Sequence, residues 1–250
     1  MVVKVFKNSD ELGSAAAKMA AAKLREVIAK KGYARLLLST GASQFDFFKH
    51  LPEEEVDWSN VEMFHLDEYV GISPEHPASF RKYLKERFVD VVHPAKYHLM
   101  NGEADPEATI AEVSALIKEA PIDLGLIGIG ENGHIAFNDP PADFDDERAY
   151  KVVTLNDTCI KQQIGEGWFE NEDQAFKQAI SMTCKQIMAC ESIISVVPHS
   201  VKATAIKNTL TLDLTPNVPA TLLKQHKDVT VMCDENSAAL VDKETLARFC

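Results

Sequence analysis

The sequence lacks the cysteine spacings that mark a zinc site or a redox pair. Its five cysteines are scattered and include no C-x-x-C pair, which predicts reduced, structural thiols. It also lacks a signal-peptide core and any apolar run near the roughly 18 residues that a membrane span requires. These absences predict a cytoplasmic protein with no metal and no membrane partner.

Basic residues are also scarce. The chain has 26 lysines and arginines against 38 aspartates and glutamates, a formal net charge of −12. Such a balance argues against nucleic acid as a partner, because polyanions reward a basic surface. An anionic ligand would therefore need a local cationic pocket. At 250 residues, with 46% hydrophobic residues and no internal repeat, the chain suits a single domain over 1–250.

Strand-like and helix-like segments alternate along the chain. Strands are expected at Val2–Phe6, Arg35–Ser39, Val61–Leu66, Ile122–Ile129, Ala149–Leu155, Ser192–Val197 and Asp228–Cys233. Helices are expected at Glu11–Lys31, Gln44–Leu51, Ala78–Phe88, Thr183–Met188, Val201–Leu210 and Asn236–Phe249. This alternation predicts an α/β fold of the Rossmann-like, doubly wound type, with a mainly parallel sheet and helices on both faces. The polar segment Asn138–Glu147 suits a mobile flap within a lid over about 138–170.

The segment GIGENGHIAFNDP, from Gly128 to Pro140, follows an apolar strand and carries His134 and Asp139. An imidazole titrates near cellular pH and could shuttle a proton, with Asp139 orienting it. A histidine is more often a polar core or capping group, but the neighbouring Asn132 and Gly133 disfavour simple core packing. No second histidine stands at ligand spacing, so a metal site is disfavoured.

Three other segments follow expected strands. The loop Ser39-Thr40-Gly41-Ala42-Ser43 could hold a phosphate at a helix N-terminus, or could be a plain turn with Ser43 as the cap. Asp67 directly follows a strand and is favoured over Glu68 to face a cleft, although an acidic pair is often only a solvated turn. Lys202, near a helix start, is the best cation for an anion. Because parallel strand ends share one edge of a sheet, these segments should converge.

Two long motifs then identify a family. FHLDEYVGISPEHPASF, from Phe64 to Phe80, and the His134 motif resemble the glucosamine-6-phosphate deaminase (isomerase) family, and the likeness covers most of the chain. The resemblance implies conversion of an amino-sugar 6-phosphate to fructose 6-phosphate and ammonia, with no redox cofactor and no metal. By position, it makes His134 the ring-opening group and Asp67 the proton-abstracting base. Phosphate binding falls on the Ser39–Ser43 loop and Lys202.

The chain departs from the family at two places. Asp139 stands where a longer glutamate is usual, while Asn132 is expected to be a positioning group. An arginine that commonly helps to hold the phosphate is absent from residues 162–171, so either Lys161, Arg148 or another cation replaces it, or the substrate's anionic end is held differently. The preferred hexosamine phosphate, allosteric control and oligomeric state stay open, with a homo-oligomer among the options.

Two other functions agree less well with the sequence. A 6-phosphogluconolactonase shares the implied fold, but its usual motifs resemble GDERxVP and GHxASLFP, whereas this chain has LDEYVG and GHIAFNDP. A non-catalytic sugar-phosphate sensor would usually carry a DNA-binding helical module, whereas here the first helix begins the domain itself. Both are less favoured than the deaminase.

Overall fold

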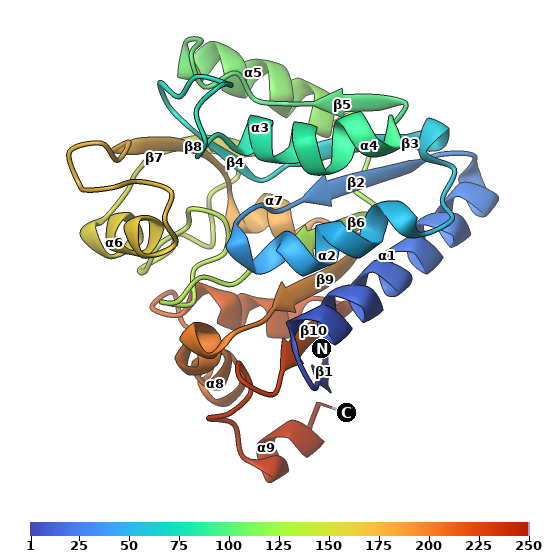
Figure 1. Ribbon diagram of the computed structural model, residues 1–250, viewed down its shortest axis with the longest axis vertical. Coiled ribbons are helices and arrows are strands. Elements are labelled where there is room, and N and C mark those ends of the chain that lie inside the picture. Colours follow the sequence, from blue (N-terminus) through green and yellow to red (C-terminus); the bar gives the residue numbers. More distant parts are fainter. Residues whose placement is uncertain (250) are drawn as a thin grey trace.

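Two β-sheets organise the protein, and the computed structural model describes residues 1–249 (Figure 1). The larger sheet has seven strands in the order β1-β10-β9-β6-β2-β3-β5, and every neighbouring pair is parallel. These strands are β1 (Val2–Phe6), β2 (Ala34–Leu38), β3 (Val61–His65), β5 (Lys96–His98), β6 (Leu124–Ile127), β9 (Ser192–Val197) and β10 (Val229–Asp234). The predicted mainly parallel sheet is confirmed.

Helices cover both faces of this sheet. The α-helices are α1 (Ser9–Lys31), α2 (Phe45–His50), α3 (Phe80–Leu84), α4 (Asp90–Val92), α5 (Pro106–Ile117), α6 (Asp157–Gly165), α7 (Cys184–Met188), α8 (Ala203–Thr211) and α9 (Lys243–Ala247). The long α1 begins at Asn8, whose side chain accepts a hydrogen bond from Glu11 N–H at 2.9 Å, and ends at Gly32 in the left-handed conformation. Among the described residues, no helix is long and apolar enough to cross a membrane.

Two apolar cores lie on opposite faces of the large sheet. Leu36 and Leu38 of β2 pack in one core with α1 and α2, while Leu37 packs in the other with α5, α7 and α8. This alternation follows from the two-residue period of a strand, and it makes β2 apolar at successive positions. The doubly wound arrangement predicted from the sequence is therefore present.

The strand order reverses between β2 and β6. From β2 the chain proceeds outward through β3 to β5, whereas from β6 it proceeds through β9 to β10. Loops that leave adjacent strands in opposite directions open a crevice at such a switch point. The loops after β9, β6, β2 and β3 carry the candidate residues, and these four strands are consecutive in the sheet. The expected convergence is thus built into the strand order.

A second sheet is antiparallel and was not expected. It has the order β4-β8-β7, formed by β4 (Asp67–Tyr69), β8 (Gln178–Met182) and β7 (Tyr150–Thr154). The sequence pattern placed Asp67 at the end of a strand and β7 among the alternating strands of the main sheet. Instead, Asp67 pairs with Ser181 and Lys151 pairs with the same residue from the other side. The pairing of Asp67 with Ser181 joins residues more than a hundred positions apart and leaves no local signal in the sequence.

Several helix predictions also need correction. Residues 157–165 form α6, where the pattern around Gly165 indicated irregular chain. The last helix is only Lys243–Ala247 rather than Asn236–Phe249, because Asp242 accepts a hydrogen bond from Thr245 N–H at 2.7 Å and starts the helix there. The helix expected over Ala78–Phe88 begins at Phe80 and passes into a π-helical turn at Lys85–Val89. Both β5 and α5 were missed.

Candidate active site

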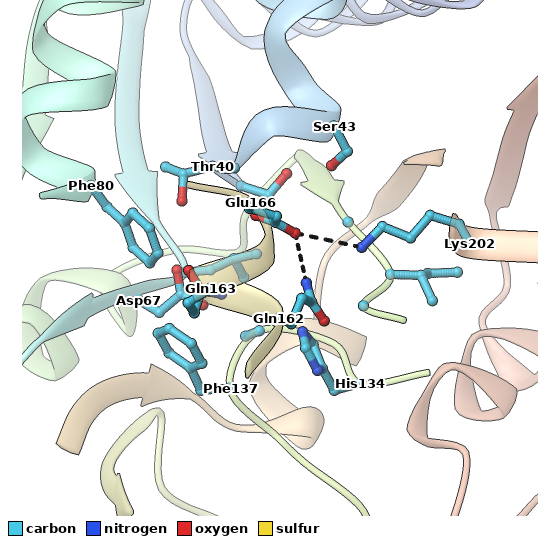
Figure 2. A pocket seen from close by; sticks show the side chains of 17 residues that line it. Thr40, Ser43, Asp67, Phe80, His134, Phe137, Gln162, Gln163, Glu166 and Lys202 are labelled. Atoms are coloured by element: carbon cyan, nitrogen blue, oxygen red, sulfur yellow. Dashed lines mark hydrogen bonds and ion pairs between the residues drawn. The ribbon is translucent and has the colours of Figure 1, made fainter. Parts of the chain in front are cut away.

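A cleft lies at the switch point of the large sheet (Figure 2). It brings together Asp67, His134 and Lys202, which are 67 residues or more apart in the chain. Its lining comprises Ser39, Thr40, Gly41, Ser43, Leu66, Asp67, Phe80, Gly128, Ile129, Gly130, His134, Ala136, Phe137, Gln162, Gln163, Glu166 and Lys202. Of the predicted residues, Ala42, Asn132 and Asp139 do not line it.

Asp67 faces the cleft from β4 but is 7% exposed. Burial, and secondarily the charge of Glu68, raises the pKa of Asp67 to about 8. A carboxyl group with a pKa near cellular pH can both accept and return a proton. The neighbouring Glu68 points elsewhere, as expected for successive residues of a strand.

Glu68 is fully buried and fixes the start of α3. Its carboxylate accepts hydrogen bonds from the backbone N–H groups of Phe80 (3.1 Å) and Arg81 (2.8 Å) and from the Ser79 hydroxyl (3.0 Å). The carboxylate thereby satisfies N–H groups that a helix start leaves free. Burial nonetheless raises the pKa of Glu68. Glu68 therefore ties the strand that carries Asp67 to α3.

His134, Asp139 and Asn132 form a connected group behind the cleft. The Oδ1 atom of Asp139 lies 3.2 Å from His134 Nδ1 and accepts a hydrogen bond from Asn132 Nδ2 at 3.1 Å. The Oδ1 atom of Asn132 in turn accepts a hydrogen bond from His134 N–H at 3.1 Å. Burial would raise the pKa of Asp139, but the adjacent His134 and the hydrogen bond from Asn132 outweigh it and lower the pKa. A charged Asp139 can thus orient the imidazole.

Gly130 makes room for the imidazole. A Cβ atom at this position would overlap the His134 ring, so no residue with a side chain fits without moving His134. Gly133 serves a second purpose, because its φ of 84° lies in the left-handed region that favours glycine. The glycines of the motif therefore position the histidine rather than leaving the loop loose.

The Ser39–Ser43 loop and Lys202 lie together at the other end of the cleft. Ser43 does not cap a helix: its hydroxyl accepts a hydrogen bond from Gln44 Nε2 at 3.0 Å, and α2 has no side-chain cap. Ser39 is buried with its hydroxyl unpaired. Lys202 is 4% exposed and lies in a 3-10 turn just before α8. The hydroxyls and the buried amine make this end suitable for an anion.

Helix α6 supplies lining residues that sequence reasoning missed. Gln162, Gln163 and Glu166 reach the cleft from its C-terminal half and from the residue after it (Figure 2). Gln163 accepts a hydrogen bond from the Tyr69 hydroxyl at 2.7 Å, and Gln162 accepts one from Glu131 N–H at 3.2 Å. The available signal was Asn156, which caps α6 through Cys159 N–H at 2.8 Å. In contrast, no residue of the expected flap 138–147 lines the cleft.

Neither cation suggested as a replacement for the missing arginine reaches the cleft. Lys161 is exposed on α6, and the Arg148 guanidinium pairs with Asp146 at 2.7 Å. Within residues 1–249, Lys202 is the only lysine or arginine that lines it. The same part of the chain contains no group of three or more side chains that could hold a metal ion.

The fold and cleft define a Rossmann-like α/β protein with a buried carboxyl group, an imidazole and a buried amine at the switch point. The family model described as glucosamine-6-phosphate isomerases/6-phosphogluconolactonase matches residues 7–232. The chain belongs to this family.

Relatives and solved structures agree with this membership. The chain is 36% identical over 254 aligned positions to a glucosamine-6-phosphate deaminase of Thermoanaerobacter, covering 98% of this chain and 97% of the relative. It is 34% identical over 242 positions to that of Lactobacillus delbrueckii subsp. bulgaricus, covering 96% and 100%. A solved monomeric glucosamine-6-phosphate deaminase superposes with a TM-score of 0.89 at 30% identity, covering 96% of this chain and 100% of that one.

A solved 6-phosphogluconolactonase of Shewanella baltica is more distant. It superposes with a TM-score of 0.78 at 19% identity, covering 94% of this chain and 97% of that one. At such identity the likeness extends to the fold alone.

Proposed function

We propose that this protein is an amino-sugar phosphate isomerase and deaminase that converts glucosamine 6-phosphate and water to fructose 6-phosphate and ammonia. One observation carries the proposal: Asp67, with a pKa raised to about 8, shares a cleft with His134 and Lys202. The deaminases at 34–36% identity over nearly the whole chain support the same reaction.

The reaction begins with ring opening. His134 moves a proton between the anomeric hydroxyl and the ring oxygen, and Asp139 holds its imidazole through the 3.2 Å contact at Nδ1. Asn132, hydrogen-bonded to both residues, is a positioning group.

Asp67 then carries the isomerisation. Its carboxylate takes the proton from C2 and returns it to C1, while one proton of the substrate's ammonium group passes to the aldehyde oxygen. C1 thus becomes a CH2OH group, and an iminium group is left at C2. Water adds to this carbon, and ammonia leaves as the ketone forms. Phe80 and Phe137 flank Asp67 in the cleft and limit its access to water (Figure 2).

The substrate's phosphate binds at the opposite end. Ser39, Thr40, Gly41 and Ser43 offer hydroxyl and backbone donors, and Lys202 offers the charge. In this arrangement α6 covers the sugar, so the part of the predicted lid that lies over the cleft is α6 rather than residues 138–147.

The direct test is to incubate the purified protein with glucosamine 6-phosphate and to measure ammonia and fructose 6-phosphate. We expect both products in equal amounts, without added metal or cofactor. A panel with galactosamine 6-phosphate and mannosamine 6-phosphate identifies the preferred epimer. Turnover of 6-phosphogluconolactone with no release of ammonia from any hexosamine phosphate would overturn the proposal.

A further inference from the structure

Glu166 lies against the only lysine of the cleft. Its Oε1 atom is 3.9 Å from Lys202 Nζ, a contact that Figure 2 marks with a dashed line. The same Oε1 accepts a hydrogen bond from Gln162 Nε2 at 2.8 Å. Both partners line the cleft, as Glu166 itself does. A carboxylate therefore stands at the end of the cleft where an anion is expected.

Lys202 has no second counter-ion within bonding distance. Among residues 1–249, Glu166 is the only acid that forms an ion pair with it. Burial lowers the pKa of Lys202, while the charges of Glu166 and the more distant Glu131 act to raise it. Glu166 thus helps to keep a buried amine charged. The same charge repels any anion that approaches this amine.

Glu166 is held in place from its other side. Its Oε2 atom accepts a hydrogen bond from Trp168 Nε1 at 3.0 Å. The Trp168 ring packs edge-on against Phe45 and Tyr83, at 6.3 and 6.5 Å between centroids. The Tyr83 hydroxyl donates to the Gly41 carbonyl oxygen at 3.0 Å, which links this cluster to the proposed phosphate loop. The aromatic residues that hold the Glu166 carboxylate in place therefore also contact the Ser39–Ser43 loop.

We propose that the carboxylate of Glu166 competes with the substrate's phosphate for Lys202 and thereby weakens binding of the anionic end. This inference rests on the proposed function, because it takes a phosphate as the group that reaches Lys202. The long 3.9 Å separation is consistent with this role, since the amine keeps donors for another oxygen. A tightly held bidentate pair would not leave them free.

The test is the dissociation constant of inorganic phosphate and of fructose 6-phosphate, measured by calorimetry for the unaltered protein and for Glu166→Gln. Glutamine keeps the length of the side chain and an acceptor for Gln162 or Trp168, but it removes the charge. We expect both constants to fall about tenfold at low salt, with a smaller change at high salt. Binding of glucose, which carries neither a phosphate nor a charged amine, should not change.

Glu170→Gln is the matched control, because it removes the same charge from an exposed acid in the same segment. We expect it to leave phosphate binding unaltered. In a protein that already carries Lys202→Met, Glu166→Gln should no longer strengthen binding. Glu166→Asp, which keeps the charge on a shorter side chain, gives a second reading if the glutamine variant folds poorly, and it should change binding less than threefold.

Unchanged or weaker binding of phosphate to a folded Glu166→Gln variant would overturn the inference, as would equal tightening in Glu170→Gln. These outcomes do not depend on turnover. If the variant binds phosphate more tightly but no hexosamine phosphate yields ammonia, the competition at Lys202 stands and the proposed reaction fails.

Discussion

The two ends of the cleft differ in the charge that lies beside their buried ionisable group. At one end, burial pushes Asp67 toward its neutral, protonated form, and the like charge of Glu68 adds to this push. At the other end, burial pushes Lys202 toward its neutral form, but the opposite charge of Glu166 resists it. The first arrangement suits a group that gains and loses a proton. The second suits a group that stays charged.

This difference assigns separate roles to residues of similar burial. Asp67 and Lys202 are 7% and 4% exposed, so burial alone does not distinguish them. Their neighbours do, because an added like charge and an added opposite charge shift a pKa in opposite senses. We therefore expect changes at the Asp67 end to act on kcat and changes at the Lys202 end to act on KM.

The largest expected effect is that of Asp67→Asn, which keeps the shape of the side chain and removes the base. Proton transfer by a positioned group contributes about 10²–10⁴-fold, so kcat for glucosamine 6-phosphate should fall about 10³-fold. Binding of fructose 6-phosphate, measured by calorimetry, should change less than threefold. A variant with normal kcat would remove Asp67 from the chemistry.

Lys202→Met should have the next largest effect, and it should act on KM rather than on kcat. A hydrogen bond to a charged group is worth about 1.5–3 kcal/mol, so we expect KM to rise roughly 100-fold with little loss of kcat. Lys207→Met, an exposed change on α8, the helix that follows Lys202, is the control. A fall in kcat at unchanged KM would contradict the division between the two ends.

The gathering of candidate residues at one edge of the large sheet was predictable, because the end of each strand is marked by residues that are adjacent in the sequence. Apolar runs such as Ile122–Ile129 end where glycines or small polar residues begin, and parallel strands must end at one edge. The sequence pattern alone therefore predicts that Ser39, His134 and Lys202 lie at one cleft. Asp67 rather than Glu68 lines this cleft, in line with the alternation of side chains along a strand.

The second sheet and α6 were not predictable in the same way. Asp67 pairs with Ser181 across more than a hundred residues, and such pairing depends on the rest of the fold. Residues 157–165 are mostly polar and end beside two glycines, so they look irregular although Asn156 caps a helix there. Glu166 was missed for this reason, and with it the counter-charge of Lys202.

Asp139→Asn extends the comparison to the group behind His134, which acts with Asp67 on the proton transfers. Asparagine keeps an acceptor for Asn132 but loses the charge that lies 3.2 Å from His134 Nδ1. Losing the orienting charge should cost less than losing a proton-transfer group, so we expect kcat to fall about 30-fold. Asp139→Glu, which restores a carboxylate, should recover most of the rate. Equal loss in both variants would show that packing, and not charge, is what His134 requires.

The smallest expected effect is the pH dependence of kcat/KM. Asp67 acts as a base only when it is deprotonated, and its pKa is raised to about 8. The rate should therefore rise with pH and reach half its plateau at about pH 8, and at pH 7 it should be about tenfold below the plateau, since one pH unit changes the ionised fraction about tenfold below the pKa.

Glu68→Gln tests the cause of this shift, because it removes the like charge while keeping an acceptor for the start of α3. The acid limb of the profile should move to lower pH in this variant, whereas Lys202→Met should leave the limb where it is. If the acid limb stays in place in Glu68→Gln but moves in Lys202→Met, the titrating group lies at the Lys202 end of the cleft and is not Asp67. The two ends would then not be electrostatically separate, and the contrast between a proton-transferring carboxyl group and an amine whose charge Glu166 supports would fail.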